Sequence, residues 1–254
     1  MAERDKELQL LEKRFAELAD RAWQQNLFVF TGFLSLAEQE VLWRSAAKAG
    51  VHIELYGGMD GAERCMGRFG DPEEFGYEEP FPICAVKIEP LAEKFAENFS
   101  HRDFMGAILN LGIDRSTIGD ICVEGKCAYV FCTSTMSVFL QETLEQVRHT
   151  KVRCVPVEKL EALPEKKLSY REEHVASLRC DGLVSAVWRL SRSQGQTLFS
   201  QKKVFVNGRL TENGSQMLKD GDTVSVRGFG KFIFRGEKNT TKKGRLVIGA
   251  DLFV

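Results

Sequence analysis

The chain has 254 residues, which is enough for one to three domains. Its composition, with 43% hydrophobic and 28% charged residues, is typical of a folded protein. Seven cysteines without a C-x-x-C pair, and four histidines not clustered near them, argue against a disulfide framework and a zinc site and favour a cytoplasmic protein. No apolar stretch reaches the roughly 18–20 residues of a membrane span; the longest, 27–37, is interrupted by Thr31, Gly32 and Ser35. The charged N-terminus has no signal-peptide pattern, so we expect no membrane partner.

Residues 1–80 predict an α/β domain. Apolar residues at three- and four-residue steps predict its first helix. The second begins where Ser35 can form a capping box with Glu38. In chain order the elements are helices over 8–22 and 35–50 and strands over 51–55 and 63–69, then an acidic, proline-containing loop at 71–79.

Residues 81–160 predict a second α/β domain, with the order β-α-β-β-α-β that ferredoxin-like and RRM-type domains share. The expected elements are a strand over 83–88, a helix from Ser100 to Gly112, a hairpin over 121–132 about Gly125, a helix over 134–148 and a strand over 152–157. Residues 161–173 are expected to form a linker. The fold prediction is therefore a multidomain α/β (α+β) protein whose central domain is RRM-like or ferredoxin-like.

Residues 174–236 predict a third domain, with two short helices followed by strands. The expected elements are helices over 181–190 and 191–201 and strands over 204–206, 223–227 and 231–234, with a hairpin turn at Asn207-Gly208. Residues 237–254 are expected to be a C-terminal extension. Residues 174–254 carry fourteen Lys and Arg against six Asp and Glu, a balance of +8, so residues 1–173 carry −9. A basic region of this kind usually binds a polyanion, although surplus lysines can also simply solvate a surface.

The third domain resembles the alpha-L RNA-binding domain that small-subunit ribosomal protein S-four shares with several RNA-modifying enzymes. The matching segments are RCDGLVSAVWRLSRS from Arg179, KVFVNG from Lys203 and GDTVSVRG from Gly221, spread over about 60 residues in the family's order. Guanidinium groups and a helix N-terminus both suit phosphate oxygens. We expect Asp181 to cap its helix or orient Arg179 rather than to touch RNA. The RNA contacts expected in this domain are Arg179, Arg189, Ser191, Arg192, Lys202, Lys203, Arg227 and Lys231. The alternative is a generic small β-rich domain with a basic surface.

The central domain carries a weaker indication of RNA binding. Ala128-Tyr129-Val130 matches part of the RRM core motif, but the residues on either side depart from it, so Tyr129 is explained equally well as a core residue or as a base-stacking one. His101 and Arg102 open a predicted helix, where a cation gains nothing from the helix dipole. We expect His101, Arg102 and Arg115 to contact RNA, with ordinary surface placement as the alternative.

No catalytic motif is recognisable. Gly208-Arg209-Leu210 resembles the start of the pseudouridine synthase motif, but Thr211 stands where the catalytic Asp belongs. The segment 228–230 lacks the third glycine of a dinucleotide site, and there is no P-loop. We therefore expect a protein that is not an enzyme, with no cofactor, no metal and no small-molecule substrate. The alternative is an RNA-modifying enzyme with an unrecognised active site within residues 1–173.

Over almost its full length the sequence resembles the YlmH family of bacterial proteins. The resemblance rests on His101-Arg-Asp-Phe, Leu111-Gly-Ile-Asp-Arg, Ile118-Gly-Asp-Ile and Arg189-Leu-Ser-Arg. It implies a non-catalytic, monomeric protein that binds rRNA or tRNA on large ribosomal subunits obstructed by peptidyl-tRNA, in ribosome-associated quality control. Genes of this family often lie beside cell-division genes, so an interaction protein of the division machinery is a further alternative.

Overall fold

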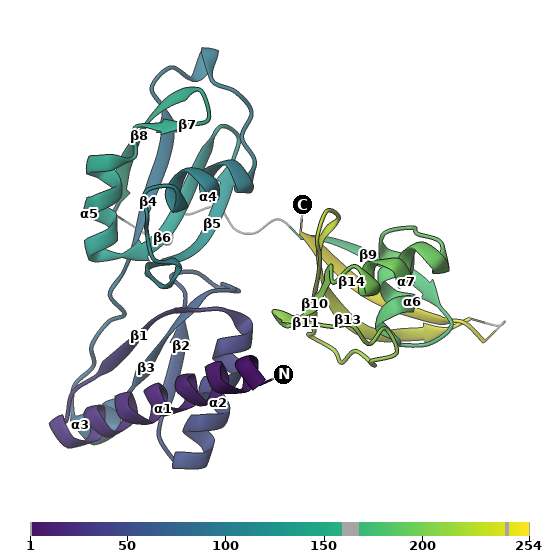
Figure 1. Ribbon diagram of the computed structural model, residues 1–254, viewed down its shortest axis with the longest axis horizontal. Coiled ribbons are helices and arrows are strands. Elements are labelled where there is room, and N and C mark those ends of the chain that lie inside the picture. Colours follow the sequence, from purple (N-terminus) through teal and green to yellow (C-terminus); the bar gives the residue numbers. More distant parts are fainter. Residues whose placement is uncertain (1, 159–167, 242–243, 254) are drawn as a thin grey trace. The chain divides into compact units, whose positions relative to one another are not determined.

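The computed structural model describes residues 2–158, 168–241 and 244–253. The chain divides into two compact units, Met1–Glu165 and Lys166–Val254 (Figure 1). Each unit has its own hydrophobic cores. The first unit contains two layers that correspond to the first two predicted domains.

The N-terminal layer is an antiparallel sheet covered on one face by two helices (Figure 1). Its elements are α1 (Ala2–Gln25), β1 (Val29–Leu34), α2 (Leu36–Ala49), β2 (Ile53–Tyr56), β3 (Cys65–Phe69) and α3 (Pro72–Phe75), with the strands in the order β1-β3-β2. The apolar stripe of α1 buries Phe15 against Val41 and Leu42 of α2. The predicted capping box of Ser35 and Glu38 is present at the start of α2. Strand β1 was not predicted, because Thr31 and Gly32 interrupt its apolar run and the run lacks the alternation of a half-buried strand.

The central layer has the predicted split βαβ topology. Its elements are β4 (Ile83–Pro90), η1 (Glu93–Phe95), α4 (His101–Leu109), η2 (Arg115–Thr117), β5 (Ile118–Glu124), β6 (Cys127–Thr133), α5 (Ser134–Thr143), β7 (Gln146–Val147) and β8 (Thr150–Val157). The antiparallel sheet has the order β5-β6-β4-β8-β7, and α4 and α5 pack on one of its faces around Phe104, Ile108 and Leu140. The predicted helix over 134–148 ends early, at Thr143, because residues 146–147 pair with β8 as strand β7.

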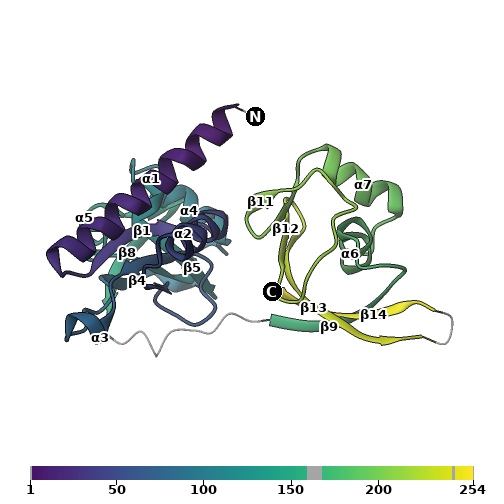
Figure 2. The same cartoon turned by 90° about the horizontal axis from the view of Figure 1, so that it is seen from below.

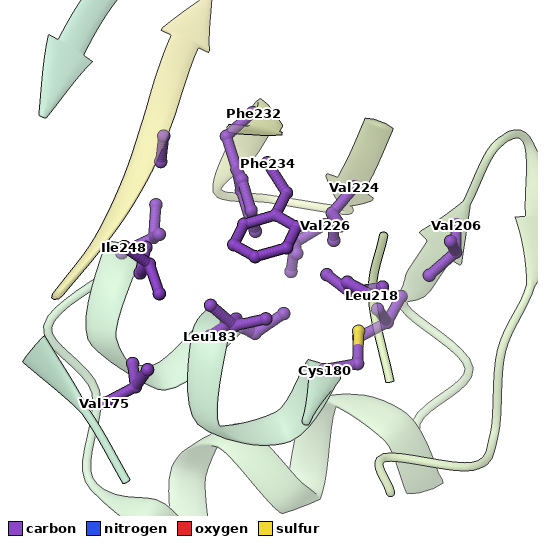
Figure 3. Close-up of a cluster of buried hydrophobic side chains, with 14 of the residues drawn as sticks. Val175, Cys180, Leu183, Val206, Leu218, Val224, Val226, Phe232, Phe234 and Ile248 are labelled. Carbon is purple, nitrogen blue, oxygen red and sulfur yellow. The ribbon is translucent and has the colours of Figure 1, made fainter. Parts of the chain in front are cut away.

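The second unit is a curved sheet with two helices on one side (Figure 2). Its elements are β9 (Leu168–Val175), α6 (Cys180–Val187), α7 (Arg192–Ser200), β10 (Val204–Val206), β11 (Arg209–Leu210), β12 (Thr223–Val226), β13 (Gly230–Thr240) and β14 (Leu246–Phe253). The strand order is β11-β10-β12-β13-β14-β9. Leu183 of α6 and Phe232 and Phe234 of β13 point into the core between helices and sheet (Figure 3).

Two boundary predictions in this region are wrong. Residues 168–173 are not linker, since they form most of β9, which pairs along its whole length with β14. Residues 237–254 are not an extension, since β13 and β14 are strands of the sheet and bury Ile248, Ala250 and Leu252 in its core. The rest of the predicted linker, residues 161–167, lies outside the described residues. The C-terminal sheet therefore needs both segments to be complete.

The two layers of the first unit are joined by a polar contact that the sequence did not reveal. Asp120 on β5 accepts hydrogen bonds from the backbone N–H groups of Glu63 (2.8 Å) and Arg64 (3.2 Å). The guanidinium of Arg64 donates to the carbonyls of Phe33 on β1 (2.6 Å) and Ile118 on β5 (3.0 Å). Beside these bonds an apolar cluster combines side chains of both layers: Phe33, Met66, Ile83, Ala85 and Phe131. We call this contact the joint.

Candidate RNA-binding surface

The corner between α6 and α7 presents two arginines at a helix N-terminus. Arg189 takes a left-handed conformation with φ of 52°, which ends α6 and lets the chain turn. Ser191, where the sequence predicts this helix to begin, caps α7 in a capping box with Gln194. Gly195 lets α7 pack closely on α6, because any Cβ there would collide with the side chain of Ser185. As a result Arg189, Ser191 and Arg192 are all exposed at one corner.

Arg179 is held by Asp181, as the sequence suggested. Its guanidinium donates to both carboxylate oxygens, at 3.1 and 2.7 Å, and Asp181 also accepts the N–H of Gly182 at 2.8 Å. The hydrogen bonds from Arg179 lower the pKa of Asp181, and the carboxylate in turn raises the pKa of Arg179. Arg179 therefore has its charge offset by a nearly buried neighbour, which makes it a weaker candidate for a phosphate contact than the two corner arginines.

The opposite end of α7 carries a second group of cations. Lys202 turns the chain with φ of 56° and pairs with Glu212 at 3.6 Å. Lys203 precedes β10, and its carbonyl accepts the N–H of Arg227, which follows β12, at 2.9 Å. Strand pairing thus places Lys203 beside Arg227, although they lie 24 positions apart in the sequence.

The two ends of α7 are connected through the turn between β12 and β13. Trp188, at the end of α6, packs against Phe229 in this turn with ring centroids 6.2 Å apart. A Cβ on Gly230 would lie 3.0 Å from the Trp188 ring, so the contact is close. Since Arg189 follows Trp188 and Arg227 lies two residues before Phe229, this contact links the segment that carries the corner arginines to the segment that carries Arg227. We call Arg189, Arg192, Lys202, Lys203 and Arg227 the basic rim.

Lys231, the last expected contact of this domain, lies on the face of the sheet that the helices do not cover. Its neighbour Phe232 is fully buried under the helices, and successive side chains of a strand point to opposite faces. The ammonium of Lys231 lies over the ring of Phe253, 5.3 Å from the centroid. Lys231 therefore belongs to a different face from the corner arginines.

In the central layer, His101 and Arg102 are exposed in the first turn of α4. Asp103 closes a capping box with Ser100 and lies 3.8 Å from Arg148, which also pairs with Glu97 at 3.4 Å. A groove of about 540 Å³ runs from Arg102 along α4 to the segment before β8. Its lining includes Arg102, Gly106, Asn110, Gln146 and Arg148. Two basic and two amide side chains at one open groove could bind RNA, although the charge of Arg148 is offset by its acidic neighbours Glu97 and Asp103.

Arg115 has a different geometry from the one expected of an RNA contact. Its guanidinium turns back onto its own chain and donates to the carbonyl of Ile118 at 2.6 Å and of Gly119 at 3.3 Å. Burial, together with the nearby charge of Arg64, lowers the pKa of Arg115 to about 10. Its own carbonyl accepts a hydrogen bond from Arg64. The side chain is therefore part of the joint, and we leave it out of the proposed RNA surface.

Tyr129 lies on the sheet face opposite the helices, where an RRM would present its stacking residues. It is half-buried, and its cross-strand neighbour Lys87 pairs with Glu89 at 2.8 Å. Glu89 also pairs with Arg153, at 2.6 Å. Two positions along β6, Phe131 is completely buried in the joint. The N-terminal layer thus covers part of this face and the remaining cations are paired with a carboxylate, which disfavours RRM-like base stacking here.

The described residues offer little that resembles catalytic chemistry. They contain no group of three or more His, Cys, Asp or Glu side chains that could hold a metal ion. Burial raises the pKa of Cys132, Cys154 and Cys180 to about 12, so these thiols stay protonated near neutral pH. No helix within the described ranges is long and apolar enough to cross a membrane.

Comparison with known proteins gives consistent results. Residues 77–161, the central layer, match the family described as the putative RNA-binding domain in YlmH. The chain is 28% identical over 227 residues to ribosome-associated protein quality control protein P2 of Bacillus subtilis, covering 87% of this chain and 86% of that protein. Among solved structures, the cell division protein ylmH from Streptococcus pneumoniae shares the fold, with a TM-score of 0.52 at 18% identity, over 62% of this chain and 95% of that one.

Proposed function

Because this chain belongs to the YlmH family, we propose that it is a non-catalytic RNA-binding protein that acts on the ribosome in ribosome-associated quality control. More specifically, we propose that it binds rRNA or tRNA on large subunits obstructed by peptidyl-tRNA. The relative with the greatest bearing on this role is the quality control protein of Bacillus subtilis, whose similarity extends over most of both chains.

The observation that carries the proposal for the C-terminal unit is the basic rim. Exposed Arg189 and Arg192 flank the capped N-terminus of α7, whose free N–H groups favour an anion. Lys202, Lys203 and Arg227 continue the positive charge to the other end of the helix. This arrangement supports the proposal that the unit is an S-four-type RNA-binding domain that contacts phosphates.

The central layer would supply a second contact. The family match covers this layer, and a groove in it is lined by Arg102 and Arg148. Arg102, which lines this groove, and the preceding residue His101 remain proposed RNA contacts. Two contacts on separate units would raise the overall affinity for one large RNA above that of either alone.

The test compares two double variants that remove the same formal charge. Arg189→Ala with Arg192→Ala removes two charge-assisted contacts at the helix end, each worth about 1.5–3 kcal/mol when well formed. RNA affinity should fall by about a hundredfold or more, because about 1.4 kcal/mol is tenfold. Lys238→Ala with Arg245→Ala removes two exposed cations near the β13–β14 turn and should cost much less.

Both variants are followed in cell lysates by sedimentation on sucrose gradients and by sequencing of crosslinked RNA. The wild-type protein should sediment with large subunits and crosslink to rRNA or tRNA, and the corner variant should move to the free fraction. Equal loss by both variants would contradict a built site and indicate diffuse electrostatic attraction. Time-dependent appearance of a modified nucleoside in rRNA or tRNA incubated with the protein and common cofactors would favour the RNA-modifying alternative.

A further inference from the structure

The outer face of the C-terminal sheet, away from α6 and α7, carries two cations held over aromatic rings. The guanidinium carbon of Arg227 lies 4.7 Å from the centroid of the Phe205 ring, and the ammonium of Lys231 lies 5.3 Å from that of Phe253. Neither pair contributes to the buried core, which is built from the alternate residues of the same strands.

Strand register places these groups in one row. Phe205 on β10 pairs with Ser225 on β12, and Ser225 pairs with Lys231 on β13. Lys231 in turn lies across from Phe253 on β14, since Phe232 pairs with Leu252. Strands in a sheet are about 4.8 Å apart, so the backbones of Phe205 and Phe253 lie about 14 Å from one another, with Ser225 and Lys231 between them in the row.

Cations border this row on one side. Arg227 follows β12 and lies beside Lys203, which precedes β10, through their backbone hydrogen bond. Both have the parity of Phe205 and Ser225 along their strands, so they face the same side. The aromatic row thus meets the basic rim at Arg227. An RNA strand bound at the rim could therefore continue across this face of the sheet.

We propose that this outer face is a stacking platform for unpaired nucleotides, in which Arg227, whose guanidinium lies over the ring of Phe205, receives a base on its guanidinium plane. Bases stack on aromatic rings and on arginine planes alike, and such contacts tolerate any sequence. Lys203 and Lys231 lie where they can contact the phosphates of the same strand. The inference rests on the proposed RNA-binding function and deepens it: the corner holds phosphates at the helix end, and the sheet face holds single-stranded RNA.

Stacking requires bases, whereas purely electrostatic binding requires only phosphates. The two kinds of surface can therefore be distinguished by comparing an RNA oligomer that has bases with one that lacks them. The full-length protein is titrated with a fluorescent oligoadenylate of about twelve nucleotides and with an abasic ribose-phosphate oligomer of the same length. We expect the oligoadenylate to bind about tenfold more tightly than the abasic oligomer. Equal binding of the two oligomers by the wild-type protein would overturn the proposal, and this is also the outcome expected if the face docks another protein.

The decisive variant is Arg227→Lys, which keeps the positive charge but removes the planar guanidinium group. It should abolish the preference for oligoadenylate, because binding of the oligoadenylate falls to the level measured for the abasic oligomer. Phe205→Leu, which keeps an apolar side chain but no ring, should weaken the preference in the same direction. Arg245→Lys, a matched substitution at an exposed arginine outside this row, should keep it. A preference that survives in both Arg227→Lys and Phe205→Leu would refute the platform, and an unchanged unfolding midpoint verifies that each variant is folded.

The corner variant separates this proposal from the proposed function. Arg189→Ala with Arg192→Ala should reduce binding to a base-paired RNA hairpin and to ribosomes and leave the ratio between oligoadenylate and abasic oligomer unchanged. If Arg227→Lys abolishes the preference for oligoadenylate and the corner variant still binds ribosomes normally, the stacking platform is supported and the corner site is refuted. The reverse pattern would reject the platform alone.

Discussion

The joint between the two layers of the first unit predicts a large effect of a single carboxylate. In Asp120→Ala the backbone N–H groups of Glu63 and Arg64 lose their acceptor, and the Arg64 guanidinium loses a neighbouring negative charge. Hydrogen bonds to a charged group contribute about 1.5–3 kcal/mol each. Because these residues are half-buried, we take the lower part of that range for each of the two bonds, and expect a loss of about 3–4 kcal/mol.

For a unit of this size, about 1 kcal/mol shifts the unfolding midpoint by roughly 2–4 °C, so Asp120→Ala should lower it by about 6–16 °C. Hydrogen exchange read by mass spectrometry adds a local measurement, since the amides of Glu63 and Arg64 should lose protection. The control is Asp60→Ala, at an exposed carboxylate in the β2–β3 turn, which should stay within about 0.5 kcal/mol of wild type. If the midpoints of the two variants agree within about 1 °C, the joint does not depend on Asp120 and the reasoning is wrong.

Three further predictions concern pH, packing and salt. Arg179 lowers the pKa of Asp181, so the stabilisation that this carboxylate gives is present above the ordinary carboxyl pKa and is lost as pH falls through the pKa of the folded state. In urea unfolding, the free energy of unfolding that Asp181→Asn loses relative to wild type should therefore shrink below about pH 4. A loss that stays constant with pH would contradict this. At Gly58 φ is 92° and an added Cβ would collide with Phe131, so Gly58→Ala should lower the free energy of unfolding by about 2–4 kcal/mol, measured by thermal unfolding. Gly61→Ala, at a position where φ is 64° and no atom is near, should lower it by only about 1 kcal/mol. If the basic rim neutralises about five phosphates, duplex RNA affinity should fall with a log–log salt slope of about −4 to −5, whereas a slope near −1 would indicate that most of the charge stays unused.

Local signals in the sequence were sufficient where a few adjacent residues determine the backbone. Ser35 with Glu38, and Ser191 with Gln194, satisfy the free N–H groups of a helix start by themselves, and both capping boxes are present. Gly125 turns the β5–β6 hairpin with φ of 58°, as its position between two strand patterns predicted. The overall α+β class and the split βαβ order followed from such signals.

Elements whose stability comes from distant partners could not be predicted from the sequence. Strand β9 is charged and alternates weakly, because it lies at the sheet edge, and only its pairing with β14 makes it a strand. The same limit applies to the candidate site. Nothing near Arg115 in the sequence shows that Arg64, 51 positions earlier, fills the same space, and Lys203 meets Arg227 only through strand pairing. Residue type identified the cations, and tertiary contacts decided which of them are free to bind.

The pairing of β9 with β14 has a mechanical consequence. Leu168, where β9 begins, lies directly opposite Phe253, where β14 ends. A pulling force applied between these two points loads the hydrogen bonds of the ladder one pair after another, as in opening a zipper, instead of shearing all of them together. Tension that enters the C-terminal unit through Leu168 while β14 is held would therefore peel off the edge strand first. The core between the helices and β12–β13 would remain intact while this strand yields.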